Sequence, residues 1–339
     1  IIALKNLYMS TNWEELITKF THLGGVIENV KQKEGKNGRG IFAINKSEKS
    51  RIFVPSNLLI NIDDIEERNG QLFINDISNC DSEIKEFFSF YEENFSWGNG
   101  GRKICELFEK NLFILPSTVK ELIKEYLLID LDIRYKGNWD ELILKQFLNS
   151  RKFFFSGKEK IAPVLELVNH EVKSLPYIRS EEGLSTPNYG PKYGEITHSY
   201  GHRSPIKRLF DYGFYCEESI IFSYPFRLQI DNYGNFLECN GSEIFDDSML
   251  SISNKKQTCI HGLPIADINI PTLPKEYLKE LIKKNFLKVS YEHLFVEIKN
   301  LNTKKRNMLL KEIKNVDNYS AQLIKKTLEY EIKAINNNC

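Results

Sequence analysis

The spacing of apolar residues divides the chain into alternating strand-rich and helix-rich stretches. Near its start, apolar side chains recur every three to four positions over residues 11–23, which predicts an amphipathic helix. Thr11 and Glu14 have the spacing of a capping box, which predicts that this helix begins at Thr11. Gly24 and Gly25 follow the last apolar position and predict the end of the helix.

Four further stretches follow this helix. Runs that are short, apolar and bounded by Gly or Lys predict strands, whereas a spacing of three to four residues predicts helices. Asn138 stands directly before one such helical stretch and is a candidate N-cap. In chain order the predictions are strands at 26–30, 41–45 and 51–55, helices from 62 to about 150, short strands and turns over 151–240, and helices over 275–335.

This β–α–β–α order predicts an α+β fold. Its core of short strands is interrupted by a helical insertion at about 62–150, and a helical C-terminal part follows. We therefore expect one domain over residues 1–240 and a second, helical domain over residues 241–339 that resembles a substrate-binding domain.

Composition and charge exclude some classes of protein. The chain has 339 residues, of which 41% are hydrophobic and 27% charged, as in ordinary globular proteins. Lys+Arg and Asp+Glu are equal at 46 each, so no global charge indicates nucleic acid or membrane as a partner. From Pro271 onward, however, 14 basic residues stand against 8 acidic ones. A solvated helical face is the ordinary explanation of such an excess.

Cysteine usage indicates a reducing compartment. The six cysteines are scattered and form no C-x-x-C pair, which argues against a zinc cluster and against a dense disulfide framework. We expect a cytoplasmic protein without a membrane span, because no run of about 18 apolar residues occurs. The sequence leaves the true N-terminus, the organism and the oligomeric state open.

Three short motifs carry candidate chemistry. The first is Gly-rich, 35-GKNGRG-40, and runs into the apolar segment 41-IFA-43. A phosphate-binding loop needs a helix at that point, and the sequence predicts a strand instead. The second is 166-ELVNH-170, at the end of an apolar run, and the third is 194-GEITHSYG-201, followed by 212-YGF-214.

In this order the three motifs resemble those of the SET-domain methyltransferases. They are most similar to the branch that includes the Rubisco large-subunit lysine methyltransferase and the actin-histidine methyltransferase. The resemblance covers roughly residues 24–215 and implies a SET-type core. It also implies S-adenosyl-L-methionine as the methyl donor and S-adenosyl-L-homocysteine as the product.

The resemblance assigns cofactor-binding roles to six residues. Backbone groups of Asn37 and Arg39 would meet the amino-acid end of S-adenosylmethionine, and the Asn169 amide would meet its methionine end. Backbone atoms of His170 would pair with the adenine. Arg151, after Ser150, resembles an arginine beside the cofactor, whereas Glu166 stands where the branch usually has Asp. The sixth residue is Tyr200.

Tyr200 corresponds to the catalytic tyrosine of the family, and Tyr212 to a second tyrosine of the same site. Methyl transfer from a sulfonium is an in-line displacement that needs a neutral nucleophile and alignment. A tyrosine hydroxyl can hold the incoming nitrogen. Phe214 would add to an aromatic wall of the substrate channel, in which an alkylated amine gains about 0.5–2 kcal/mol of cation–π attraction. The alternative for both tyrosines is a place in the core.

We therefore expect an S-adenosylmethionine-dependent N-methyltransferase that acts on a lysine of a protein or peptide. Three alternatives stay open: methylation of histidine, methylation of another nitrogen of a peptide or small molecule, and a SET-like module that binds peptides without catalysis. A metal site at His170, His198 and His202 lacks a compact ligand spacing, so we expect no metal. We also expect no specific nucleic-acid binding.

Overall fold

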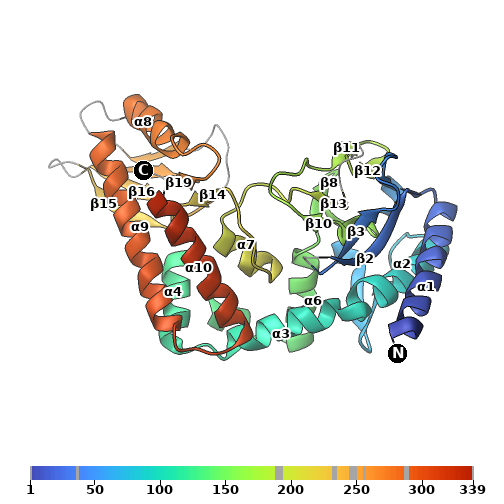
Figure 1. The fold of residues 1–339 in the computed structure, drawn as a ribbon. Helices are drawn as coiled ribbons and strands as arrows, with labels where there is room; N and C mark the ends of the chain where they lie inside the picture. Colours follow the sequence, from blue (N-terminus) through green and yellow to red (C-terminus); the bar gives the residue numbers. More distant parts are fainter. Residues whose placement is uncertain are drawn as a thin grey trace. The chain divides into compact units, whose positions relative to one another are not determined.

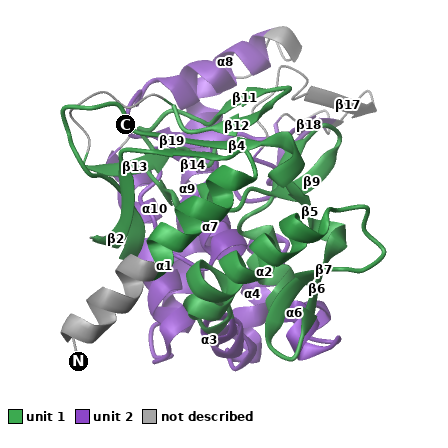
Figure 2. Ribbon diagram, turned by 90° about the vertical axis from the view of Figure 1, so that its right-hand side faces the viewer, with its two compact units in different colours: residues 1–105, 143–201 green, residues 106–142, 202–339 purple. Residues whose placement is uncertain are grey.

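A computed structural model describes residues 2–35, 38–187, 194–230, 235–243, 250–254, 257–285 and 290–337 (Figure 1). The chain forms two compact units (Figure 2). Unit 1 contains residues 1–105 and 143–201, and unit 2 contains residues 106–142 and 202–339. Each unit is thus built from two separate stretches of chain. This division differs from the domain boundary expected between residues 240 and 241, which stays a prediction.

The first helix, α1 (Ile2–His22), confirms the helical prediction but begins earlier than predicted. The backbone continues as helix through Thr11, so the predicted start of the helix at that residue is wrong. The helix ends where the glycines predict: Gly24 has φ +90°, a conformation that disfavours side chains. A Cβ on Gly25 would lie 2.3 Å from a ring carbon of Phe20, so a side chain at this position would strike the helix.

Unit 1 contains several small sheets rather than one large one. In one of them β2 and β3 form an antiparallel pair, β13 pairs antiparallel with β3, and β10 pairs parallel with β13. The strand orders are β1-β4-β12-β11, β10-β13-β3-β2, β5-β9-β8 and β6-β7. The strands are β1 (Val26–Glu28), β2 (Val30–Gly35), β3 (Gly38–Ala43), β4 (Arg51–Pro55), β5 (Ile60–Asn61), β6 (Ile65–Arg68), β7 (Gln71–Ile74), β8 (Phe153–Phe155), β9 (Lys158–Ile161), β10 (Asn169–His170), β11 (Ile178–Ser180), β12 (Gly183–Ser185) and β13 (Glu195–His198).

A block of helices separates β7 from β8, as the periodicity predicts. The block begins later than predicted, because residues 65–74 form the β6–β7 hairpin. Asn138 acts as the predicted N-cap of α6: its Oδ1 accepts the Asp140 amide at 2.9 Å. Helices α3 and α6 each run from one unit into the other along the chain. The helices are α2 (Ser82–Phe95), α3 (Arg102–Phe113), α4 (Ser117–Leu127), α5 (Leu131–Arg134) and α6 (Trp139–Asn149).

Unit 2 contains both strands and helices. It has two sheets, β14-β19 and β15-β16-β18-β17. Three of these strands lie in the predicted strand-rich stretch before residue 240, and the other three occupy 250–267, for which the sequence predicted no element. The helices predicted over 275–335 are confirmed and begin at Leu273. The elements are α7 (Pro205–Tyr212), β14 (Ile220–Phe222), β15 (Phe226–Gln229), β16 (Phe236–Cys239), β17 (Leu250–Asn254), β18 (Gln257–Ile260), β19 (Pro264–Asp267), α8 (Leu273–Asn285), α9 (Tyr291–Ile313) and α10 (Tyr319–Asn337).

The C-terminal helices share a hydrophobic core with earlier parts of unit 2. Leu309 of α9 and Ile324 of α10 are buried in one cluster with Phe108 of α3, Ile123 of α4 and Leu209 of α7. The mixed α+β class predicted from the sequence is confirmed by these elements. Within the described ranges, none of the helices combines the length and the apolar character that crossing a membrane requires.

Candidate active site

The sheet β2-β3-β13-β10 of unit 1 brings the first two motifs and the start of the third together. Glu195 of β13 lies opposite Phe42 of β3, and Asn169 of β10 lies opposite Thr197 of β13. The Gly-rich run, the Asn-His pair and the Gly-Glu run are therefore neighbours in space, although about 130 residues separate Arg39 from Asn169 in the chain.

The amide of Asn169 is fixed by two acceptors. Its Nδ2 donates to the carbonyl oxygen of Arg39 at 3.1 Å and to Oε1 of Glu195 at 2.7 Å. Both hydrogens of the amide nitrogen are therefore used, and this orientation leaves Oδ1 as the acceptor of the group. Three acceptors, namely the Arg39 carbonyl, the Glu195 carboxylate and Asn169 Oδ1, lie together. Such a set suits a ligand that offers a cationic amine.

Gly40 allows this arrangement because it has no side chain. A Cβ at this position would lie 2.5 Å from Oε1 of Glu195 and 2.6 Å from Nδ2 of Asn169, closer than any van der Waals contact. A glycine is therefore required at position 40, because the Asn169–Glu195 pair lies so close to the β3 backbone that no side chain fits there. Asn37, the other predicted residue of this run, lies outside the described residues.

His170 and Tyr200 contact each other next to Asn169. The Tyr200 amide donates to Nδ1 of His170 at 3.1 Å, and the two ring centroids are 4.8 Å apart. The same Nδ1 also lies 3.3 Å from the carbonyl oxygen of His198, so the ring is anchored to the backbone at both His198 and Tyr200. The contact fixes the chain direction directly after β13.

The Tyr200 hydroxyl is oriented by a backbone carbonyl. It lies 3.3 Å from the carbonyl oxygen of Val168 and donates to it. A hydroxyl that gives its hydrogen to a carbonyl presents its lone pairs to other donors. His198 lies beside this tyrosine, with its ring centroid 4.5 Å from that of Tyr200. Tyr200 is only half-buried.

Tyr177 belongs to this cluster, although the sequence did not indicate it. Its ring stacks on the buried His198 ring at a centroid distance of 3.6 Å, and its hydroxyl donates to the Leu165 carbonyl at 2.9 Å. Tyr177 lies just before the β11–β12 hairpin. No local motif around Tyr177 marks it.

Arg151 lies in a second polar cluster of unit 1, built around Glu166. The Nε of Arg151 is 3.7 Å from one Glu166 oxygen, and the hydroxyls of Tyr91 and Ser96 donate to the other at 2.8 and 2.6 Å. The Arg151 guanidinium also lies 3.8 Å from the centre of the Phe147 ring. Glu166 thus has defined partners at the position where the SET branch usually has Asp.

Glu92 adds a buried acid to this cluster. Burial, followed by the neighbouring charge of Glu166, raises the pKa of Glu92 well above its usual range. Burial and then Glu166 also raise the pKa of Tyr91. Burial by itself would lower the pKa of Arg151, but Glu166 and its neighbours raise it overall. Burial thus favours the protonated form of Glu92, next to the Arg151–Glu166 ion pair.

Tyr212 and Phe214 belong to unit 2. Tyr212 is the last residue of α7, and Gly213 ends that helix with φ +76° while its amide donates to the Leu209 carbonyl at 2.8 Å. The ring centroids of Tyr212 and Phe214 are 5.9 Å apart at 60°, an edge contact. The Tyr-Gly-Phe motif is therefore a helix end at which two aromatic rings meet.

Comparisons with known proteins find similarity only among solved structures. No family model matches the chain, and no curated protein matches it. The structure is similar to the SET domain of LSMT bound to lysine and AdoHcy, at 14% identity with a TM-score of 0.43, covering 97% of this chain and 90% of that one. A Rubisco LSMT structure bound to sinefungin and monomethyllysine has 16% identity and a TM-score of 0.44, covering 96% and 90%.

Proposed function

We propose that this protein is an S-adenosylmethionine-dependent N-methyltransferase whose acceptor is a lysine side chain of a protein. The observation that carries the proposal is the acceptor cluster of Asn169, Glu195 and the Arg39 carbonyl, placed directly beside the His170–Tyr200 contact. The proposed donor-binding residues lie on β3, β10 and β13, and Tyr200 follows the end of β13 by two residues.

The residues of unit 1 fit an amino-acid cofactor with a cationic end. The α-ammonium group of S-adenosylmethionine is a hydrogen-bond donor, and Asn169 Oδ1 together with the Arg39 carbonyl would accept from it. Glu195 supplies a negative charge 2.7 Å from the Asn169 amide, which favours a cation nearby. The bound cofactor would supply a methyl group on a positively charged sulfur.

Tyr200 is proposed to align the acceptor nitrogen. Its hydroxyl donates to Val168, so its lone pairs can receive an N–H of the incoming amine and hold the nitrogen in line. The nitrogen must be neutral to act as a nucleophile. The lysine ammonium would first lose its proton to solvent. The new N–C bond would then replace the S–C bond of the donor, whose sulfur would keep the electron pair. Positioning of the neutral nitrogen is therefore the main contribution of these side chains.

The test is to incubate the protein with isotopically labelled S-adenosylmethionine and host lysate, and to map the labelled residue by mass spectrometry. Labelled lysine supports the proposal. A label on histidine or on another nitrogen would show that this group, and not lysine, is the acceptor. Binding of S-adenosylmethionine without labelling of any protein would favour a peptide-binding module without catalysis. Lysine and S-adenosylmethionine are the first compounds to test in binding experiments.

Tyr200→Phe removes one oxygen and changes little volume. Loss of a polar contact that acts in the transition state typically slows a reaction by about a hundredfold to a thousandfold. We expect that loss in single-turnover methylation of the mapped substrate, with unchanged S-adenosylmethionine affinity. Tyr135→Phe, which removes a hydroxyl bonded to Glu109 in unit 2, is the matched control. A wild-type rate for Tyr200→Phe would remove this residue from the chemistry.

A further inference from the structure

A lysine of unit 1 lies on the same sheet face as the acceptor cluster of Asn169 and Glu195. Lys33 of β2 is paired with Gly40 of β3, the position that both of these side chains approach closely. Figure 1 shows β2 and β3 as neighbouring strands. Residues that are directly paired in an antiparallel ladder share one face, with their Cβ positions about 5 Å apart. Lys33 therefore stands next to the acceptor cluster, one strand away from it.

The Lys33 side chain lies over an aromatic ring of this face. Its Nζ is 4.2 Å from the centre of the Phe42 ring, a distance at which cation–π attraction acts. Phe42 follows Gly40 by two residues, so it points to the same face, and it is paired with Glu195 of β13. Phe42 is 9% exposed, whereas Lys33 is exposed. The lysine can therefore pack against the ring while its ammonium group stays in contact with water.

Gly35, the first glycine of the Gly-rich motif, leaves room for these groups. A Cβ at this position would lie 2.5 Å from Cζ of Phe42 and 3.5 Å from Oε2 of Glu195. The ring and the carboxylate therefore both reach over β2, the strand that carries Lys33. A cation, an aromatic ring and a carboxylate thus occupy one small area of the sheet face.

Two other cations of the candidate site are engaged by the protein itself. The Arg39 guanidinium donates to the carbonyl oxygen of Asn99. Arg151 is paired with Glu166, as described above. Lys33 makes no ion pair within the part of the chain that the structure describes. Its ammonium group is therefore available to a ligand.

S-adenosylmethionine carries two opposite charges on one carbon atom. Its α-ammonium group suits the cluster of Asn169 and Glu195, but the Glu195 carboxylate would repel the α-carboxylate beside it. Because both groups are attached to the same carbon, the α-carboxylate must lie close to this cluster. A zwitterionic ligand is therefore favoured here only if a cation meets its negative group, and Lys33 supplies one.

We propose that Lys33 binds the α-carboxylate of the methyl donor, while Asn169 and the Arg39 carbonyl accept its α-ammonium group. The inference rests on the proposed function, because it requires S-adenosylmethionine to bind at this sheet face. With both contacts, the site distinguishes an amino-acid cofactor from a simple amine.

The test compares two ligands by isothermal titration calorimetry. Decarboxylated S-adenosylmethionine keeps the amine and the sulfonium and lacks only the carboxylate. Lys33→Met removes the charge and keeps an unbranched apolar side chain over Phe42. Lys31→Met is the matched control, because Lys31 is an exposed lysine of the same strand and the same face. Thermal unfolding without ligand checks that the variants are folded.

Lys33→Met should bind S-adenosylmethionine about tenfold more weakly than the wild type, the scale of a hydrogen bond to a charged group. The decarboxylated ligand should bind the wild type and Lys33→Met equally. Lys33→Arg should restore most of the affinity for S-adenosylmethionine, and Lys31→Met should keep it. Since Lys33 is exposed, added salt should reduce the difference between the wild type and Lys33→Met.

Three results would overturn the inference while leaving the proposed function intact. The first is a wild-type affinity of Lys33→Met for S-adenosylmethionine. The second is an equal loss of affinity for both ligands in Lys33→Met, or the same loss in Lys31→Met, because Lys33 would then act through the fold or through general charge. The third is that Arg151→Met, and not Lys33→Met, abolishes the preference for the ligand with the carboxylate. A wild-type protein that binds neither ligand contradicts the proposed function together with the inference.

Discussion

Asn169 illustrates how strand neighbours can fix the orientation of a single side-chain amide. Its two hydrogens are committed to Arg39 and Glu195, so the oxygen is held in place before any ligand arrives. Such preorganisation reduces the entropy that binding would otherwise cost. The sequence indicated Asn169 through a dipeptide, but the role of Glu195 as its partner depends on strand register and could not be predicted locally.

Asn169→Ala should weaken S-adenosylmethionine binding by about tenfold or more, since removing one partner of a buried hydrogen bond costs about 1–3 kcal/mol. Isothermal titration calorimetry measures the change, and circular dichroism checks the fold. Asn61→Ala is a suitable control, because that amide also bonds a carboxylate of unit 1, Asp64, at 3.0 Å outside the predicted site. An Asn169→Ala variant with wild-type affinity would exclude this residue from cofactor binding.

Gly40→Ala should disturb the same amide from the opposite side. The new Cβ would have to displace Glu195 or Asn169 from contacts of about 2.5 Å, and overpacking of this kind typically costs about 1–3 kcal/mol. We expect a lower melting temperature together with weaker S-adenosylmethionine binding. Gly137→Ala is the control, because nothing lies within 4 Å of a Cβ there. If both variants behave alike, the close approach at Gly40 does not constrain the site.

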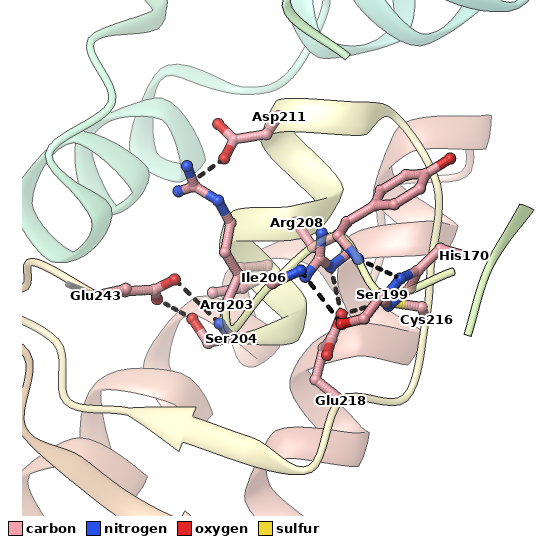
Figure 3. A network of polar contacts seen from close by, with 12 residues as sticks. His170, Ser199, Arg203, Ser204, Ile206, Arg208, Asp211, Cys216, Glu218 and Glu243 are labelled. Atoms are coloured by element: carbon pink, nitrogen blue, oxygen red, sulfur yellow. Dashed lines mark hydrogen bonds and ion pairs between the residues drawn. The ribbon is translucent and has the colours of Figure 1, made fainter. Parts of the chain in front are cut away.

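At the scale of elements, α7 is held at its start by carboxylates. The amide of Ser204 donates to Glu243 at 3.0 Å, and the Ser204 hydroxyl donates to the other oxygen of the same carboxylate. The Ile206 amide donates to Glu331 at 2.9 Å (Figure 3 shows Glu243 at Ser204). Carboxyl oxygens at the first turn thus satisfy amides that have no partner within the helix. These partners come from distant sequence, so local capping rules could not identify them.

Glu243 makes the stability of this helix start depend on pH. Although the residue is only partly buried as a whole, burial of its carboxyl group raises the pKa to about 7, with Ser204 opposing and Glu331 adding to the shift. The folded form therefore holds the proton more tightly than the unfolded form. The contribution of Glu243 to the free energy of unfolding should decrease as the pH rises from about 4.5 through about 7, by at most about 1.4 kcal/mol per pH unit.

Urea unfolding of the wild type and of Glu243→Gln at pH 5, 6, 7 and 8 measures this contribution. The difference between the two proteins should change in favour of the glutamine variant as the pH rises. Glu329→Gln, at an exposed carboxylate of α10, is the control for loss of a charge. Parallel curves for the wild type and Glu243→Gln would show that Glu243 does not titrate in this window.

Local sequence signals predicted the ends of helices correctly where the neighbouring residues did not extend the helix. Asn138 caps α6 as predicted, and the glycines after α1 end that helix. The capping box at Thr11 failed because the residues before it also continue the helix. The β6–β7 hairpin was missed within the predicted helical stretch, and its two strands have only four residues each. The stability of such short strands depends on pairing with another strand. The spacing of apolar residues along the chain does not show whether a partner strand is present.

At the scale of the whole molecule, the compact units do not follow the order of the chain. The sequence predicted a boundary between residues 240 and 241, because periodic helices follow a strand-rich region. Within unit 2, however, Leu309, Ile324 and Leu328 share one core with Phe108 and Ile206. Ser320 of α10 also donates to the Phe108 carbonyl at 2.8 Å. Such pairing of distant segments leaves no local trace in the sequence.

A chain ending at residue 270 tests whether the C-terminal helices are separable. The deletion would remove the core residues that α9 and α10 contribute, and large truncations of buried apolar side chains cost about 2–5 kcal/mol each. We expect hydrogen–deuterium exchange to show lost amide protection in α3, α4 and α7 along with the deleted helices. The β3 and β13 strands of unit 1 should stay protected, because their ladder partners lie within unit 1.

Met308→Ala in the intact chain is the control for this experiment, because Met308 lies on α9 with 42% of its surface exposed. It should leave the protection pattern unchanged, whereas Ile324→Ala, at a fully buried position of α10, should reproduce part of the loss in α4 and α7. If α3, α4 and α7 keep their protection in the truncated chain, the C-terminal segment is an independent domain, and the boundary expected from the sequence is correct. Loss of protection in all three helices would instead make α9 and α10 part of the fold that holds Tyr212.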